Sequence, residues 1–210
     1  PNRPGFATGL AIMGFGFASL IAGPLMQFLV AQVGLVNNFI ILGVIYLVVM
    51  GASSLYLKAP QPKQPPRTTK DKSTMYVHNH GMLANDAMKT WQFGALWWIF
   101  FINITCGIGL LSLASPMAQE TIGMTPAAAA SLVGIIGIFN GGGRIAWSTI
   151  SDYFGRAQTY ILFFIIQIIA FYVLAETNNA LTFQVLILLI ITCYGGGFAC
   201  MPAYLADLYG

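Results

Sequence analysis

The sequence predicts an all-α protein that crosses a membrane several times, and three observations support this fold class. Hydrophobic residues make up 57% of the 210 residues and charged residues only 7%, whereas a soluble domain carries about 25% charged residues. Several apolar runs approach or exceed the roughly 20 residues that a helix needs to span a bilayer. Segment 161–175, ILFFIIQIIAFYVLA, is apolar on every side, whereas a membrane strand alternates apolar and polar residues. Helices are therefore favoured over a β-barrel.

Six apolar segments are long enough to span, given a helical rise of about 1.5 Å per residue. We expect transmembrane helices at 6–32, 36–57, 93–118, 126–150, 158–175 and 181–204. The linker 58–92 is rich in Pro and Lys, and we expect an extended connector with a surface helix near MLANDAMKTW. Its basic residues could also bind anionic lipid. The chain begins PNRPG and ends ADLYG, and we expect both ends to continue in a longer protein.

The basic residues sort to one side of the predicted membrane. If the six segments cross in turn, the start of the chain, the linker 58–92, the turn 151–157 and the end of the chain share one side. Every Lys and Arg except Arg144 lies on that side. Because short cytoplasmic loops carry an excess of Lys and Arg, we expect an integral multi-pass protein of the plasma or inner membrane, with residues 58–92 in the cytoplasm.

Several functional classes find little support in the residues. The basic residues are not interleaved with aromatic residues as on a nucleic-acid surface, so we expect no nucleic-acid partner. Cys106, Cys193 and Cys200 lie in apolar segments without ligand spacing, and we predict small hydrophobic core residues. His78 and His80 lack a third ligand nearby, and we expect neither a metal nor a cofactor. No predicted span contains the His, Asp or Glu that a membrane-embedded enzyme needs, so we expect no enzyme.

Arg144 is the charged residue that lies deep within a predicted span. An arginine at mid-bilayer costs about 2.5–3.5 kcal/mol on insertion scales. The side chain could reach the interface instead, but Arg144 lies about 12 Å from Asp152 along the helix. It could also form a buried ion pair, but no predicted span contains an acidic residue, so the partner would come from helices outside the chain. We therefore predict a functional arginine that faces a cavity or a ligand.

The neighbours of Arg144 fit a carboxylate-binding site. Asn140 lies four residues earlier on the same helix face, where its amide can hydrogen-bond to a ligand that the arginine holds. Gly141, Gly142 and Gly143 remove side-chain bulk, so that a substrate or another helix can approach; close helix packing explains them as well. The planar guanidinium binds a carboxylate through two parallel hydrogen bonds, and a carboxylate is therefore the expected ligand group.

A second charged cluster closes the same segment. Asp152, Gly155 and Arg156 fit a tight turn in which the glycine permits a positive φ. This turn resembles the G-x-x-x-D-x-x-G-R loop motif of the major facilitator superfamily. With FNGGGR just upstream, the chain is similar to the oxalate/formate antiporter family and its monocarboxylate-transporter relatives. PNRPGFATGLAIMGFGF resembles the start of helix 5 in that family, and YGGGFACMPAYLADLYG resembles the end of helix 10.

The resemblance covers the whole chain and implies six of the twelve transmembrane helices of a major facilitator bundle. Residues 1–57 would hold the last two helices of the N-terminal half, residues 58–92 the central linker, and residues 93–210 the first four helices of the C-terminal half. The remaining helices of the same transporter and the lipid bilayer are then the expected partners, and the full-length protein is expected to be a monomer.

The resemblance also implies roles for individual residues. Arg144 would hold the substrate carboxylate beside Asn140, and aromatic residues would surround the substrate at Phe15, Tyr194 and Phe198. Oxalate-transporting members have tyrosines at the positions of Phe15 and Phe198 and use a lysine from helix 11, which lies beyond this chain. A monocarboxylate such as lactate or formate is therefore at least as good a candidate as oxalate. Apolar lining or helix packing is the alternative explanation for each aromatic residue.

The implied function is secondary active transport of small carboxylates by alternating access. An unneutralised arginine would disfavour rocking until a carboxylate binds, which favours anion exchange. Proton-coupled symport is the alternative, and it needs a titratable group that no predicted span supplies. A non-transporting receptor or assembly subunit, with the same helices, is the alternative of another class.

The cytoplasmic turn is expected to act as a gate. Arg156 would pair with Asp207 when the cytoplasmic side is closed, and Asp152 would cap a neighbouring helix end. The alternative is a set of solvated loop charges that contribute little.

Overall fold

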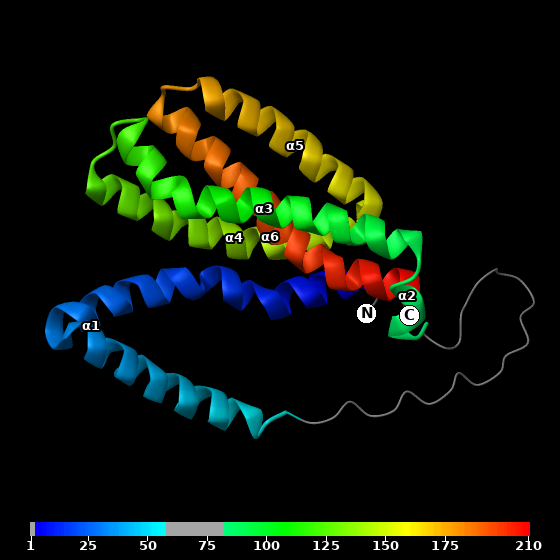
Figure 1. Cartoon of the computed structure of the whole chain (residues 1–210), viewed down its shortest axis with the longest axis horizontal. Helices are drawn as coiled ribbons and strands as arrows, with labels where there is room; N and C mark the ends of the chain where they lie inside the picture. The colour runs from blue at the N-terminus through cyan, green and yellow to red at the C-terminus, as the bar shows by residue number, and fades with distance from the viewer. Residues whose placement is uncertain (1–2, 58–81) are drawn as a thin grey trace, which may run out of the picture. The chain divides into compact units, whose positions relative to one another are not determined.

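The computed structural model describes residues 3–57 and 82–210, and every regular element among them is a helix (Figure 1). The elements are α1 (Pro4–Ser54), α2 (Ala84–Ala87), α3 (Trp91–Glu120), α4 (Pro126–Phe154), α5 (Arg156–Glu176) and α6 (Ala180–Tyr209). Five of these helices are long and apolar enough to cross a membrane. The predicted all-α, multi-pass membrane fold is confirmed. Most of the linker, including His78 and His80, lies outside the described residues.

Helix α1 contains both of the first two predicted spans. They are joined at Gly34, whose φ of 78° and ψ of 169° are not helical, so the chain turns at one residue without a separate loop. The Asn37 side chain donates to the carbonyl of Val33 across this break, at 3.0 Å. Glycine permits the backbone angles, and the asparagine satisfies a carbonyl that the interrupted helix leaves open.

The described residues form two compact units. One comprises residues 3–22 and 82–210, and the other comprises residues 23–57. The boundary falls inside α1, because its first turns carry three buried glycines that contact α4. The predicted division of the chain at 58–92 stays a prediction.

Helix α6 is the centre of the first unit and packs against each of α3, α4 and α5. Its buried aliphatic residues join those of α3 and α4 in one cluster, which includes Leu132, Ile136 and Ile187. A second cluster lies around Tyr160 and Phe163 of α5. Two of the cysteines, Cys193 and Cys200, are buried in this second cluster as small apolar side chains, as predicted.

The turns place four parts of the chain at one end of this unit. A single residue, Gly155, separates the end of α4 from the start of α5. Its φ is 97°, so the positive φ expected at this turn is present. Met82 donates its N–H to the carbonyl of Tyr209 at 2.8 Å, which brings the segment before α3 beside the end of α6. Gly5 lies against Asp152 at the same end. These contacts bring together the start of α1, residue 82, the turn between α4 and α5 and the end of α6, and the membrane side that they share stays a prediction.

Large apolar side chains cover the outer surface of the helices. Ile168 of α5 is 69% exposed and Leu47 of α1 is 75% exposed, among many others. A soluble protein does not expose a continuous apolar surface of this size, whereas hydrocarbon solvates it. The protein is therefore an integral, multi-pass membrane protein.

Gly34→Ala is expected to lower the free energy of unfolding by about 1–3 kcal/mol, because a β-carbon is strained at these backbone angles. The control is Gly43→Ala, because Gly43 lies in the regular part of α1 and a β-carbon there meets no described atom within 4 Å. That control should be neutral or slightly stabilising. Thermal unfolding in detergent measures both, and equal stability of the two variants would contradict the role given to Gly34.

Candidate functional site

Arg144 lies in the middle of α4, ten residues before its end at Phe154, and its side chain is only 1% exposed. A fully buried guanidinium needs hydrogen-bond acceptors or a compensating charge. None of the acidic residues in the described part of the chain pairs with it. The buried charge is therefore held by neutral groups alone within the described helices.

Two nitrogens of the Arg144 guanidinium have hydrogen-bond acceptors among the described residues, and the third has none. Nε donates to Oδ1 of Asn140 at 3.3 Å, one helical turn earlier, and Nη1 donates to the carbonyl of Ile12 in α1 at 3.4 Å. The remaining nitrogen, Nη2, is buried and has no hydrogen-bond partner among the described residues. Because a charged donor left unpaired in a dry site is costly, Nη2 is the atom of this cluster most in need of an acceptor.

Two phenyl rings lie against the guanidinium. The Cζ atom of Arg144 is 4.8 Å from the ring centroid of Phe15 and 5.0 Å from that of Phe198. The two rings stack with centroids 6.4 Å apart, and Tyr194 meets Phe198 edge-on at 5.3 Å. The negative ring faces stabilise the cation and also exclude water from it. The structure thus brings together all five predicted substrate-binding residues; their role in binding stays a prediction.

Two residues of this cluster were not predicted from the sequence. Phe100 of α3 packs edge-on against Phe198 with ring centroids 5.2 Å apart, and Ile12 contributes only its main-chain carbonyl. Phe100 stands in the run WWIFF, and Trp97 and Phe101 in the same run are exposed. Nothing in the sequence distinguishes the inward ring from its neighbours, and a main-chain acceptor has no sequence signature.

The three glycines before Arg144 face different neighbours. Gly141 contacts Gly16 of α1, and a β-carbon at Gly143 would lie 2.7 Å from Cα of Thr192 in α6, so the predicted close packing is present at both. At Gly142 a β-carbon would meet no described atom within 4 Å, and close packing there stays a prediction. Successive helical residues point in different directions, so a run of three cannot all face one helix.

Asp152, near the end of α4, holds the start of α1. Its carboxylate accepts the N–H of Gly5 at 2.9 Å and the N–H of Phe6 at 3.0 Å, both in the first turn of α1. Those N–H groups have no partner within their own helix, and the helix dipole favours an anion there. Asp152 therefore caps a neighbouring helix, which was one of the two expected contacts of this turn.

Arg156 links the same carboxylate to α6. Its Nη2 is 2.6 Å from Oδ1 of Asp152, and its Nε donates to Oδ2 of Asp207 at 3.0 Å. A further bond joins Nη1 to the hydroxyl of Ser151. The Asp152 and Arg156 side chains are 4% and 9% exposed, whereas that of Asp207 is 50% exposed. The first two are thus not solvated loop charges; the gating role of the group stays a prediction.

The sequence of the whole chain is similar to that of a known protein family. The model of the Major Facilitator Superfamily matches residues 1–210. The chain belongs to this superfamily. It is 24% identical over 213 residues to an oxalate:formate antiporter of Oxalobacter formigenes, and 28% identical over 213 residues to YhjX, an uncharacterized MFS-type transporter of Escherichia coli K12. Each alignment covers all of this chain but only 49% and 51% of those relatives. The chain thus spans about half their length.

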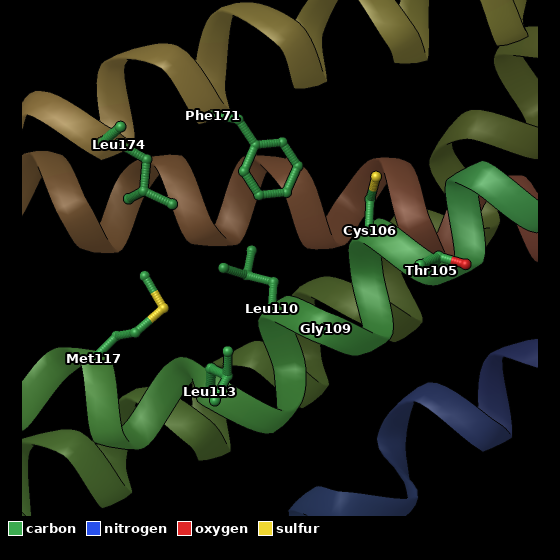
Figure 2. Close-up of a pocket in the computed structure, with 9 residues that line it drawn as sticks. Thr105, Cys106, Gly109, Leu110, Leu113, Met117, Phe171 and Leu174 are labelled. Carbon is green, nitrogen blue, oxygen red and sulfur yellow. The ribbon is translucent and has the colours of Figure 1, made fainter.

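An apolar pocket of this superfamily member lies away from the arginine, between α3 and α5 (Figure 2). It has a volume of about 490 Å³, and Phe171 and Leu174 of α5 face Cys106 and Leu110 of α3 across it. The hydroxyl of Thr105 in its wall already donates to the carbonyl of Phe101 at 2.8 Å. The pocket offers no cation to an anionic ligand, and it is separate from the candidate site.

Asp152→Ala is expected to destabilise the protein by about 3–5 kcal/mol, because it removes a buried charge that holds Arg156 and the first turn of α1. Asp207→Ala removes the other carboxylate from the same arginine, yet it should cost only about 0–1 kcal/mol because that side chain is half exposed. Unfolding of both variants of the full-length protein measures the contrast. A larger effect at Asp207 than at Asp152 would contradict this ranking.

Proposed function

We propose that this chain is part of a secondary active transporter that moves small carboxylate anions across a membrane by alternating access. The observation that carries the proposal is the unpaired Nη2 of the buried Arg144. A carboxylate is the group that best matches a guanidinium edge, since it accepts parallel hydrogen bonds and neutralises the charge. Superfamily membership and the named antiporter among the relatives support transport, although neither identifies the substrate.

The surroundings favour a small monocarboxylate, such as formate or lactate. Arg144 is the only cation of the described cluster, and both rings that touch it are phenylalanines without a hydroxyl donor. A dicarboxylate would need a second cation or further donors for its distal group. The phenol of Tyr194 is the polar aromatic group nearest to Phe198 in this cluster. One carboxylate with a compact apolar remainder fits the described residues best.

The distribution of acidic residues favours exchange over proton symport. Among the described residues, acidic side chains lie in α2 or in the last turn of a longer helix: Asp86, Glu120, Asp152, Glu176 and Asp207. None therefore lies beside Arg144, where a proton-coupling group would sense the substrate. In an exchanger, the bound carboxylate neutralises the charge of Arg144 while the two halves of the transporter move. Without a bound carboxylate, the unneutralised charge disfavours that movement.

The contacts at the end of α4 suit a gate. Asp152 and Arg156 connect the start of α1, which precedes the linker, to α6, which follows it. Among the residues of 3–22 whose burial the structure describes, the buried positions are glycines: Gly5, Gly9 and Gly16. Each allows close contact with α4. Two large side chains of this part of α1 also face α4, because the Phe15 ring lies over Arg144 and the Phe17 ring lies beside Gly141. Separation of α1 from α4 would therefore disrupt polar main-chain contacts and the packing of two phenyl rings, a limited set of contacts that suits a reversible gate.

Transport by Arg144→Lys should fall by roughly tenfold to a hundredfold, because lysine keeps the charge but lacks the planar fork and its anchoring hydrogen bonds. Counterflow of formate, lactate and oxalate in proteoliposomes containing the full-length protein measures this. Lys89→Arg is the control, since Lys89 is exposed and pairs with Asp86 away from the site. Wild-type uptake by Arg144→Lys, with normal membrane insertion, would rule out the assignment. Failure of the wild-type protein to bind or exchange any of these carboxylates would overturn the proposed function.

Asp207→Asn should shift the protein toward the state that is open to the cytoplasm, with substrate preference unchanged. The variant weakens the bond between α6 and Arg156, and in the proposed mechanism this bond forms only when this end is closed. Labelling of single cysteines placed on either side of the site measures the balance. Asp86→Asn is the control, because Asp86 is exposed and its ion pair among the described residues is with the nearby Lys89. Equal labelling of the Asp207→Asn and wild-type proteins on both sides would contradict a gating role.

A further inference from the structure

The glycine run of α6, residues 195–197, meets a different group at each position. A β-carbon at Gly195 would overlap the main-chain oxygen of Asn140 and lie 2.8 Å from its side-chain Oδ1. At Gly196 a β-carbon would lie 2.6 Å from Cβ of Trp147, and at Gly197 it would overlap the amide of Asn103. Of the three glycines, Gly195 is thus the one whose missing side chain leaves room for the residue that anchors Arg144.

The space at Gly195 determines where the Asn140 amide can lie. Asn140 is 6% exposed, and its Oδ1 accepts the N–H of Nε of Arg144 at 3.3 Å. A methyl group at residue 195 would push both oxygens of Asn140 away from α6. The amide would then no longer point at Nε with the same distance and angle, and hydrogen bonds weaken steeply as their angle closes.

We propose that Gly195 is a positioning residue for the carboxylate site. It lets α6 approach α4 closely enough to hold the Asn140 amide, and that amide holds Nε so that Nη2 faces the ligand. Arginine is long and flexible, so an anchored guanidinium loses less freedom when a carboxylate binds. This inference rests on the proposed function for the identity of the ligand, but the contact between Gly195, Asn140 and Arg144 does not.

The test compares identical substitutions at adjacent glycines in the full-length protein. Gly195→Ala should weaken binding of labelled formate or lactate by at least about tenfold, the effect of losing one hydrogen bond to a charged group. Gly196→Ala is the matched control. It disturbs the same contact between α4 and α6 at the Trp147 side chain, not at the site, so it should reduce stability and leave affinity within about twofold.

A double-mutant cycle separates positioning from general damage. If Gly195 acts through the Asn140 amide, Gly195→Ala should have little further effect on affinity once Asn140→Ala is present. Effects that multiply independently in the double variant would overturn the proposal. If Gly195→Ala does not reach the membrane, Asn140→Gln decides. Its longer amide cannot occupy the space beside Gly195 in the same way, so wild-type affinity in that variant would also overturn the proposal.

Labelling of Arg144 by phenylglyoxal gives a readout that needs no carboxylate. An unanchored guanidinium should react several-fold faster in Gly195→Ala than in Gly196→Ala, as followed by mass spectrometry of the peptide that contains Arg144. Equal rates in the two variants would contradict the positioning role. If the wild-type protein binds no carboxylate but this difference is present, the proposed function fails and the positioning role stands.

Discussion

The structure depends on one buried charge that its own helices compensate only in part. Arg144 is held by an amide on one side, by a main-chain carbonyl on another and by two phenyl rings, all of which are neutral. Such groups lower the cost of burying a cation without removing its demand for an anion. The site therefore favours anions, because a negatively charged ligand stabilises the buried guanidinium better than water or an apolar molecule does.

The need of Arg144 for hydrogen-bond acceptors is linked to the close packing of the helices around it. Small residues let α4 approach α1 on one side and α6 on the other, at Gly16, Gly143 and Gly195. In a bilayer, helices gain little from the hydrophobic effect when they associate, so short backbone distances and polar contacts hold them together. Around Arg144 the same short distances bring a carbonyl and an amide within reach of the guanidinium. Packing and ligand chemistry therefore share the same glycines.

Much of this arrangement could be predicted from the sequence because it follows from the cost of polar groups in lipid. The spans, the sorting of basic residues and the anomaly of Arg144 all express that cost directly. Contacts that depend only on which groups face one another in the folded protein could not be predicted. Phe100 differs from the exposed Phe101 only in the direction of its side chain. Ile12 contributes a main-chain atom that every residue possesses, and Gly142 differs from its neighbours by which helix lies opposite. The bend at Gly34 was hidden for a similar reason, since one positive φ replaced the expected loop.

The first turns of α1 are bound to α4 through their backbone. Asp152 takes N–H groups, Arg144 takes a carbonyl, and the buried positions between them are glycines. The Phe15 ring adds a side-chain contact with Arg144 and Phe198, but the main-chain contacts do not depend on the identity of residue 15. A substitution at Phe15 would therefore change the surroundings of the guanidinium while the main-chain contacts between α1 and α4 remain. Helix α1 is thus a segment in which new substrate preferences can evolve without loss of those main-chain contacts.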